Sequence, residues 1–195
     1  TISVGGVLGY YDSSDNSITS CANYGAVTGT GNNIGGMVGF FANGNIQNSA
    51  NYGNITGTDN VGNLIGNAEI CNLNNVLGTG NVTATLDTEH AGLLVGTIND
   101  SGTASGILAY NCSAKLSING TEQTDDAVKA IGYGSLTSAY RIKAFTAEQL
   151  KSGLVAFILQ ENVSGGLLWG QKLGTDNWPL LSSANKVYSD GDITM

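Results

Sequence analysis

Several features that are common in other proteins are scarce in this sequence. It has one proline among 195 residues, and only 11% of its residues are charged, against about 25% in ordinary soluble domains. The single proline excludes collagen and proline-rich linkers. Apolar residues make up 41% of the chain, which is enough for a core and, with so little charge, argues against disorder. No apolar run approaches the roughly 18 to 20 residues of a membrane-spanning helix.

Basic residues are absent from the first 114 positions. Seven acidic residues precede Lys115, and the whole chain has a net charge of -8 at pH 7. Phosphate binding needs clustered lysine and arginine, so we do not expect nucleic acid as a partner. The asymmetry of charge along the chain predicts that its first and second parts differ in structure.

Motifs for catalysis or metal binding are also missing. The sequence contains no G-x-S-x-G nucleophile elbow and no HExxH motif. The one histidine, His90, follows Glu89 at a repeat junction, and we interpret it as a corner residue of the fold. The acidic segments 12–16 and 190–192 do not match a calcium-binding loop. We therefore expect no catalytic residue, no cofactor and no metal site.

The three cysteines have no C-x-x-C spacing, and an odd number cannot close a full disulfide framework. They are Cys21, Cys71 and Cys112. One interpretation is that they are small buried apolar residues. The alternative is one disulfide and one free thiol.

Internal repetition dominates the chain. A Gly-rich apolar element starts near residues 4, 34, 61, 91 and 127; its copies are VGGVLG, IGGMVG, VGNLIG, AGLLVG and the worn AVKAIG. A second element, Asn-Tyr-Gly-x-Val/Ile-Thr-Gly, follows at 23 and 51, with a weaker copy near 78. Between the two lies a single apolar residue, namely Ile18, Ile46, and Ile70 or Leu73. Spacings of about 27 to 36 residues are typical of stacked repeats.

Each repeat reads as three short strands separated by Gly and Asn, which favour corners. This pattern predicts an all-β fold, a right-handed parallel β-helix over residues 1–140, with extra corner residues at 12–17 and 122–126. After it, Thr146 and Gln149 form a capping box, and apolar spacing predicts a helix at about 147–160. Short strands follow, near 167–173 and 178–181. We expect the segment 141–195 to cap the open end of the β-helix.

These repeats resemble the GLUG-motif repeats of bacterial surface proteins. The likeness rests on segments 6–9, 36–39, 63–66 and 93–96 and on the Asn-Tyr-Gly elements between them. It implies a secreted or surface-anchored, adhesin-like protein, and such repeats also occur beside the protease domain of some immunoglobulin A peptidases. The resemblance brings no catalytic residue. Because the chain starts at Thr1 without Met and Val4 is already inside a repeat, we expect it to be part of a longer chain.

The sequence therefore predicts a non-catalytic extracellular module that presents a binding or spacer surface to a host protein or a glycan. The candidate ligand surface is an aromatic and amide ladder made of Tyr24, Tyr52, Asn23 and Asn51, whose alternative role is to stabilise the stack. A first rival is an accessory module of a larger secreted enzyme such as a protease. A second is a carbohydrate-active β-helix, because segments 125–126 and 141–143 are faintly similar to the acids and the Arg-Ile-Lys of polygalacturonases.

Overall fold

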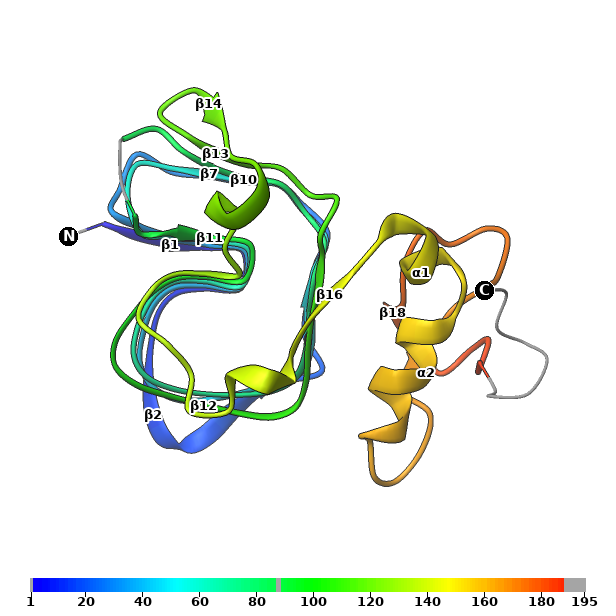
Figure 1. Cartoon of the computed structure of the whole chain (residues 1–195). Helices are drawn as coiled ribbons and strands as arrows, with labels where there is room; N and C mark the ends of the chain where they lie inside the picture. Colours follow the sequence, from blue (N-terminus) through cyan, green and yellow to red (C-terminus); the bar gives the residue numbers. More distant parts are fainter. Residues whose placement is uncertain (1, 87–88, 188–195) are drawn as a thin grey trace.

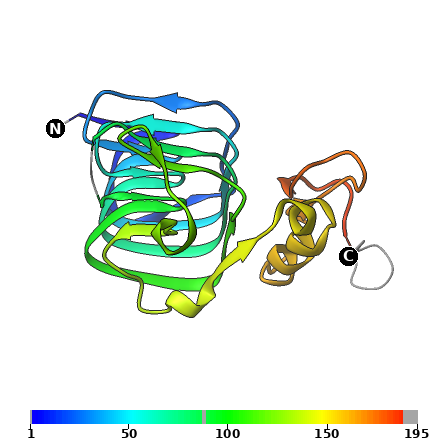
Figure 2. The same cartoon turned by 45° about the horizontal axis from the view of Figure 1, so that its top comes forward.

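The computed structural model describes residues 2–86 and 89–187 and shows a parallel β-solenoid of about five turns. Figure 1 looks along the solenoid, so that successive turns overlie one another, and Figure 2 shows the turns stacked. The repeats therefore form the fold that the sequence predicts.

Three sheets make the walls of the solenoid. The first contains β1 (Ser3–Gly5), β5 (Asn33–Gly35), β8 (Val61–Gly62) and β11 (Ala91–Gly92). The second contains β4 (Val27–Thr28), β7 (Ile55–Gly57), β10 (Val82–Ala84), β13 (Leu116–Ile118) and β14 (Thr121–Glu122). The third contains β2 (Leu8–Thr19), β6 (Val38–Asn51), β9 (Ile65–Gly78), β12 (Val95–Asn111) and β15 (Ile131–Tyr133), with β3 (Ala22–Asn23) on β6 and β16 (Ile142–Phe145) on β12. The strand pairs of these sheets are parallel except for β13 and β14.

The strand register confirms the repeat starts. Val4 pairs with Ile34, and Val61 pairs with both Ile34 and Ala91. The worn fifth copy is also in register, since β12 pairs with β15 at the equivalent position of their repeats. The apolar residue of the third turn is Leu73, which pairs with Ile46.

The expectation of three separate short strands per turn is wrong for the third sheet. There, one long strand runs from the Gly-rich element past the apolar residue, and β12 reaches 17 residues. The strand bends at bulges without breaking, so its hydrogen-bond ladder continues around the turn. The predicted extra residues at 12–17 form one such bulge, because Asp12 pairs with Asn43 whereas Ser17 pairs with Asn45.

The interior is divided into two lobes. The third sheet encloses a cluster that includes Phe41, Ile46 and Leu73. The first and second sheets enclose another that includes Ile34 and Ile55. Between the lobes the walls approach closely, which gives the solenoid the narrow waist visible in Figure 1.

The C-terminal segment begins with the predicted capping box, in which the Thr146 hydroxyl accepts from Gln149 N and Gln149 Oε1 accepts from Thr146 N. The single helix expected over 147–160 is instead two, α1 (Ala147–Lys151) and α2 (Leu154–Glu161). Gly153 separates them with a φ of 88°, a left-handed conformation that ends the first helix. The predicted strands are present as the antiparallel pair β17 (Trp169–Gly170) and β18 (Leu180–Leu181).

The helices do not cap the end of the solenoid, which corrects our expectation. They lie against its flank (Figures 1 and 2), where Leu150, Val155 and Leu159 share a buried cluster with Ala50, Leu77 and Ala109 of successive turns. The flank carries small and apolar outward side chains there, and burying them is worth about 25 cal/mol per Å².

At the end of the solenoid, the irregular last turn places Leu136 in the core instead. Leu136 lies in the sequence between the 3-10 helices η1 (Asp125–Ala127) and η2 (Ala139–Arg141). No helix among the described residues is long and apolar enough to cross a membrane.

Candidate functional site

The two asparagines of the predicted ladder lie at the waist, where Asn23 is half-buried and Asn51 is buried. Asn23 Nδ2 donates to Asn51 Oδ1 at 2.7 Å, and Asn51 Nδ2 donates to Gly53 O at 2.8 Å. Asn51 is fully buried, and a β-carbon on Gly36 of the opposite wall would collide with its amide. Asn51 is therefore excluded from any ligand surface, and its role is to satisfy a buried backbone carbonyl of its own wall, that of Gly53.

The two tyrosines point outward and stack as predicted. The ring centroids of Tyr24 and Tyr52 are 4.8 Å apart with an interplanar angle of 20°. Trp178 of the C-terminal segment stacks on Tyr52 at 5.9 Å, so Tyr52 takes part in a three-ring stack. Tyr52 is buried, its hydroxyl donates to Pro179 O at 2.8 Å, and burial raises its pKa above the ordinary value. Tyr52 thus belongs to an internal interface.

No repeated motif of the sequence points directly to Trp178 in this stack. Its indirect sign is Thr79, which stands one turn after Tyr52 and replaces the tyrosine of the earlier copies. Threonine is too small to continue the aromatic stack, and Trp178 supplies a ring from elsewhere in the chain.

Tyr24 is the most exposed member of the predicted ladder. Its side chain is 61% exposed, and its ring is held in place by stacking on Tyr52. A fixed aromatic face of this kind can pack against the C–H face of a sugar or against an apolar side chain of a protein.

A second outward ring pair was missed by our sequence reasoning. Tyr10 of β2 stacks on Phe40 of β6, with centroids 5.6 Å apart and planes inclined by 6°. Tyr10 is also exposed. The signal was present, because both residues follow the last glycine of the Gly-rich element in their repeats.

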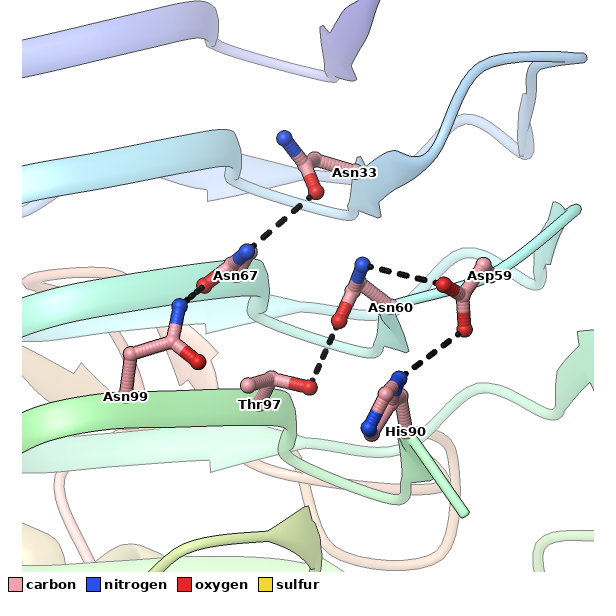
Figure 3. A network of polar contacts seen from close by, with 7 residues as sticks. All are labelled: Asn33, Asp59, Asn60, Asn67, His90, Thr97 and Asn99. Atoms are coloured by element: carbon pink, nitrogen blue, oxygen red, sulfur yellow. Dashed lines mark hydrogen bonds and ion pairs between the residues drawn. The ribbon is translucent and has the colours of Figure 1, made fainter. Parts of the chain in front are cut away.

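His90 lies at a corner, directly before β11, as the sequence predicts. Its Nδ1 is 3.2 Å from Asp59 Oδ1, and Asn60 Nδ2 donates to Asp59 Oδ2 at 3.4 Å. Thr97 Oγ1 continues the network by donating to Asn60 Oδ1 at 2.6 Å, as Figure 3 shows. The Thr97 hydroxyl is thus engaged with Asn60, and the imidazole ring packs edge-on against Tyr133.

Asparagine amides also connect successive turns in a second chain drawn in Figure 3. Asn99 Nδ2 donates to Asn67 Oδ1 at 2.8 Å, and Asn67 Nδ2 donates to Asn33 Oδ1 at 3.4 Å. These bonds join neighbouring turns and stabilise their stacking.

The cysteines are unpaired in the structure. Cys71 fits the interpretation as a buried apolar residue, and burial raises its pKa to about 12. Cys112 is exposed and Cys21 is half-buried, so that interpretation does not extend to Cys112.

The charged residues weighed for polysaccharide cleavage or calcium do not converge. Asp125 and Asp126 lie in η1, and the ion pairs found in the described part of the chain do not include them. Arg141 donates to Gly106 O at 3.3 Å. Among residues 2–86 and 89–187, no group of three or more His, Cys, Asp and Glu side chains could hold a metal ion. The segment 190–192 lies outside the described residues.

Comparison with known proteins supports the fold. No protein family and no curated protein matches the chain. A crystal structure described as that of a putative immunoglobulin A1 protease from Bacteroides ovatus is similar, with a TM-score of 0.65 and 22% sequence identity. The similarity covers 93% of this chain and 53% of that one, so the chain spans about half the length of its structural relative. At this identity the likeness shows a shared β-solenoid architecture.

Proposed function

We propose that this chain is a non-catalytic module, outside the cell or on its surface, that presents a rigid binding face to a host protein or a glycan. The observation that carries the proposal is Tyr24, an exposed ring fixed by stacking on Tyr52 and, through it, on Trp178. Because the ring is already ordered, a ligand that packs on it loses little side-chain entropy.

The repeats support an adhesin-like, bacterial role of the GLUG type. The Gly-rich and Asn-Tyr-Gly elements occupy equivalent positions in successive turns, as expected of repeats of that kind. A stack of short turns gives an extended, stiff body, which suits a protein that holds a binding face away from a surface.

A screen of the intact chain against a glycan array and host matrix proteins tests this function. Tyr24→Ala should abolish or strongly reduce binding, whereas Tyr140→Ala, which removes another exposed tyrosine that is not part of the stack, should not. Melting curves should show that both variants are folded. Absence of binding to every probe, or equal binding by both variants, would contradict a role of this surface.

A second candidate function is an accessory module of a larger secreted enzyme such as a protease. It is favoured by the likeness to the Bacteroides ovatus chain, of which this module covers 53%. The test is to read the coding sequence on both sides of the module and to assay the full protein with and without it. A neighbouring protease domain whose cleavage of host protein depends on the module would favour this role.

A further inference from the structure

A polar hollow lies at the last turns of the solenoid, beside the lobe that the first and second sheets enclose. This lobe is called the smaller lobe below. Its volume is about 430 Å³, and its lining residues are Glu89, Ala91, Ile118, Asn119, Thr121, Gln123, Ala127 and Lys129. They come from β11, from the hairpin of β13 and β14, and from η1 and the residues that follow it. Figure 1 shows this helical turn between β13 and β11. The volume is within the range of about 300 to 1,000 Å³ that small-ligand sites occupy.

The backbone around the hollow is fixed by hydrogen bonds. Asn119 N donates to Ala84 O at 2.9 Å, and Leu93 N donates to Lys129 O at 2.9 Å. Gln123 N donates to Leu116 O at 2.8 Å across the hairpin. A ligand would therefore meet a preformed site, which favours binding because little of the wall must be ordered.

The polar side chains of the hollow have bonding capacity to spare. Within the described residues, neither the Glu89 carboxylate nor the Asn119 amide nor the Thr121 hydroxyl makes a hydrogen bond to protein. Gln123 Nε2 donates to Thr121 O, which leaves its Oε1 open. The Lys129 ammonium makes one long contact of 3.5 Å, to Gly132 O. Hydrogen-bond donors and hydrogen-bond acceptors thus line the same small volume.

The apolar part of the lining is a compact patch made of Ala91, Ile118 and Ala127. Ala91 is buried, and Ile118 packs against the core of the smaller lobe, so the patch is part of a rigid wall. A ligand that fits the hollow therefore needs one apolar face and several groups that can both donate and accept.

We infer that this hollow binds a saccharide, one or two units in size. Sugar hydroxyls both donate and accept, as the amide, hydroxyl and charged groups here require, and the C–H face of a pyranose matches the apolar patch. One carboxylate and one ammonium leave the lining without net charge. A phosphate or another strong anion would face Glu89, and a cation would face Lys129, so a neutral polyhydroxylated ligand fits best.

This inference rests on the proposed function, because it names a ligand class for a binding module, but it uses a site distinct from Tyr24. The test uses the intact chain and ligand-observed NMR at about 10 mM probe, a concentration that detects millimolar affinities. The probes are the methyl glycosides of galactose, mannose, fucose and N-acetylglucosamine, together with lactose and cellobiose.

Ala127→Trp fills the hollow from an exposed position, and Ala139→Trp makes the same change in η2, also at an exposed position. Asn119→Gly removes an amide without strain, because Asn119 already has a φ of 48°. At least one probe should bind, about tenfold more weakly to Ala127→Trp and detectably more weakly to Asn119→Gly. Ala139→Trp should bind as the parent does.

Three results would overturn the inference: no probe binds, Ala127→Trp binds as well as Ala139→Trp, or Tyr24→Ala alone loses binding. The third would leave the proposed function standing while moving the sugar site to Tyr24. If no probe binds and the wider screen of glycans and matrix proteins is also negative, the proposed function fails too. Melting temperatures of the variants separate loss of binding from loss of folding.

Discussion

Asn63 makes in the third turn the hydrogen bond that Asn51 makes in the second, but from the opposite wall of the waist. Asn51 Nδ2 donates to Gly53 O at 2.8 Å, and Asn63 Nδ2 donates to the equivalent Gly80 O at 2.9 Å. The facing residue changes accordingly, since Asn51 packs against Gly36 and Asn63 packs against Gly78. In the second turn the asparagine is on one wall and the glycine on the other, and in the third turn the two residue types are reversed. Each of these turns therefore has one asparagine amide at the waist, and the facing glycine leaves room for it.

Replacing Asn51 with alanine should destabilise the solenoid by about 1 to 3 kcal/mol, because Gly53 O and the Asn23 amide then lose a partner at the waist. Urea unfolding followed by circular dichroism measures the change. The control is Asn162→Ala, which removes an exposed amide that also bonds to backbone, to Ile158 O. Equal losses in the two variants would contradict a special role for the buried amide.

Tyr52→Phe should loosen the C-terminal segment from the flank. The change keeps the ring stack and deletes the hydroxyl that donates to Pro179 O, a loss of about 1 kcal/mol. Faster hydrogen exchange over residues 146–187, with little change in β6 and β9, is the expected result. Tyr24→Phe, at an exposed position, is the control and should leave exchange unchanged.

Thiol labelling should distinguish Cys112 from Cys71. Cys112 is exposed and should react with a disulfide reagent at pH 8 in the fast phase. Cys71 is buried with a pKa of about 12, so it should react only after unfolding. Cys112→Ser should remove the fast phase. A fast Cys71 in the native protein would show that the core opens readily.

Stability should fall in alkaline solution. The Cys71 pKa rises from 9.0 to about 12 on folding, so its contribution is complete below pH 9 and is lost as the pH rises toward 12. Tyr52, whose pKa is also raised by burial, adds to the loss above about pH 10. Each group can contribute a slope of up to about 1.4 kcal/mol per pH unit. Urea midpoints between pH 8 and 10 measure the slope, and Cys71→Ala should make it shallower between pH 9 and 10. An unchanged slope would contradict the assignment.

The sequence was informative wherever structure follows from a repeated or local pattern. The Gly-rich copies predicted the register, because equivalent residues of a parallel solenoid stack directly. Thr146 and Gln149 predicted the start of α1, because a capping box involves only neighbouring residues. The stacking of Tyr24 on Tyr52 could be predicted because both occupy the same position in successive repeats.

Contacts between the repeats and the non-repeated segment were beyond such reasoning. Nothing periodic links Trp178 to Tyr52 or Pro179 to the flank, so the covered half of the aromatic ladder could not be foreseen. The inward direction of Asn51 depends on how closely two walls approach, which the pattern of one strand does not encode. The hollow between β11 and η1 involves the worn repeat, where the pattern is weakest.

The position of the C-terminal helices on the flank has a consequence for cooperativity. In a pure stack each turn interacts only with its neighbours, so the ends can unravel one turn at a time. Here one buried cluster joins Ala50, Leu77 and Ala109 from three successive turns, and Leu159 O accepts from Asn75 Nδ2 between them. Separating any of these turns breaks contacts with the same helical segment. The middle of the solenoid should therefore unfold as a single unit. The helices contact several turns at once, so these turns unfold in one cooperative transition and not one after another.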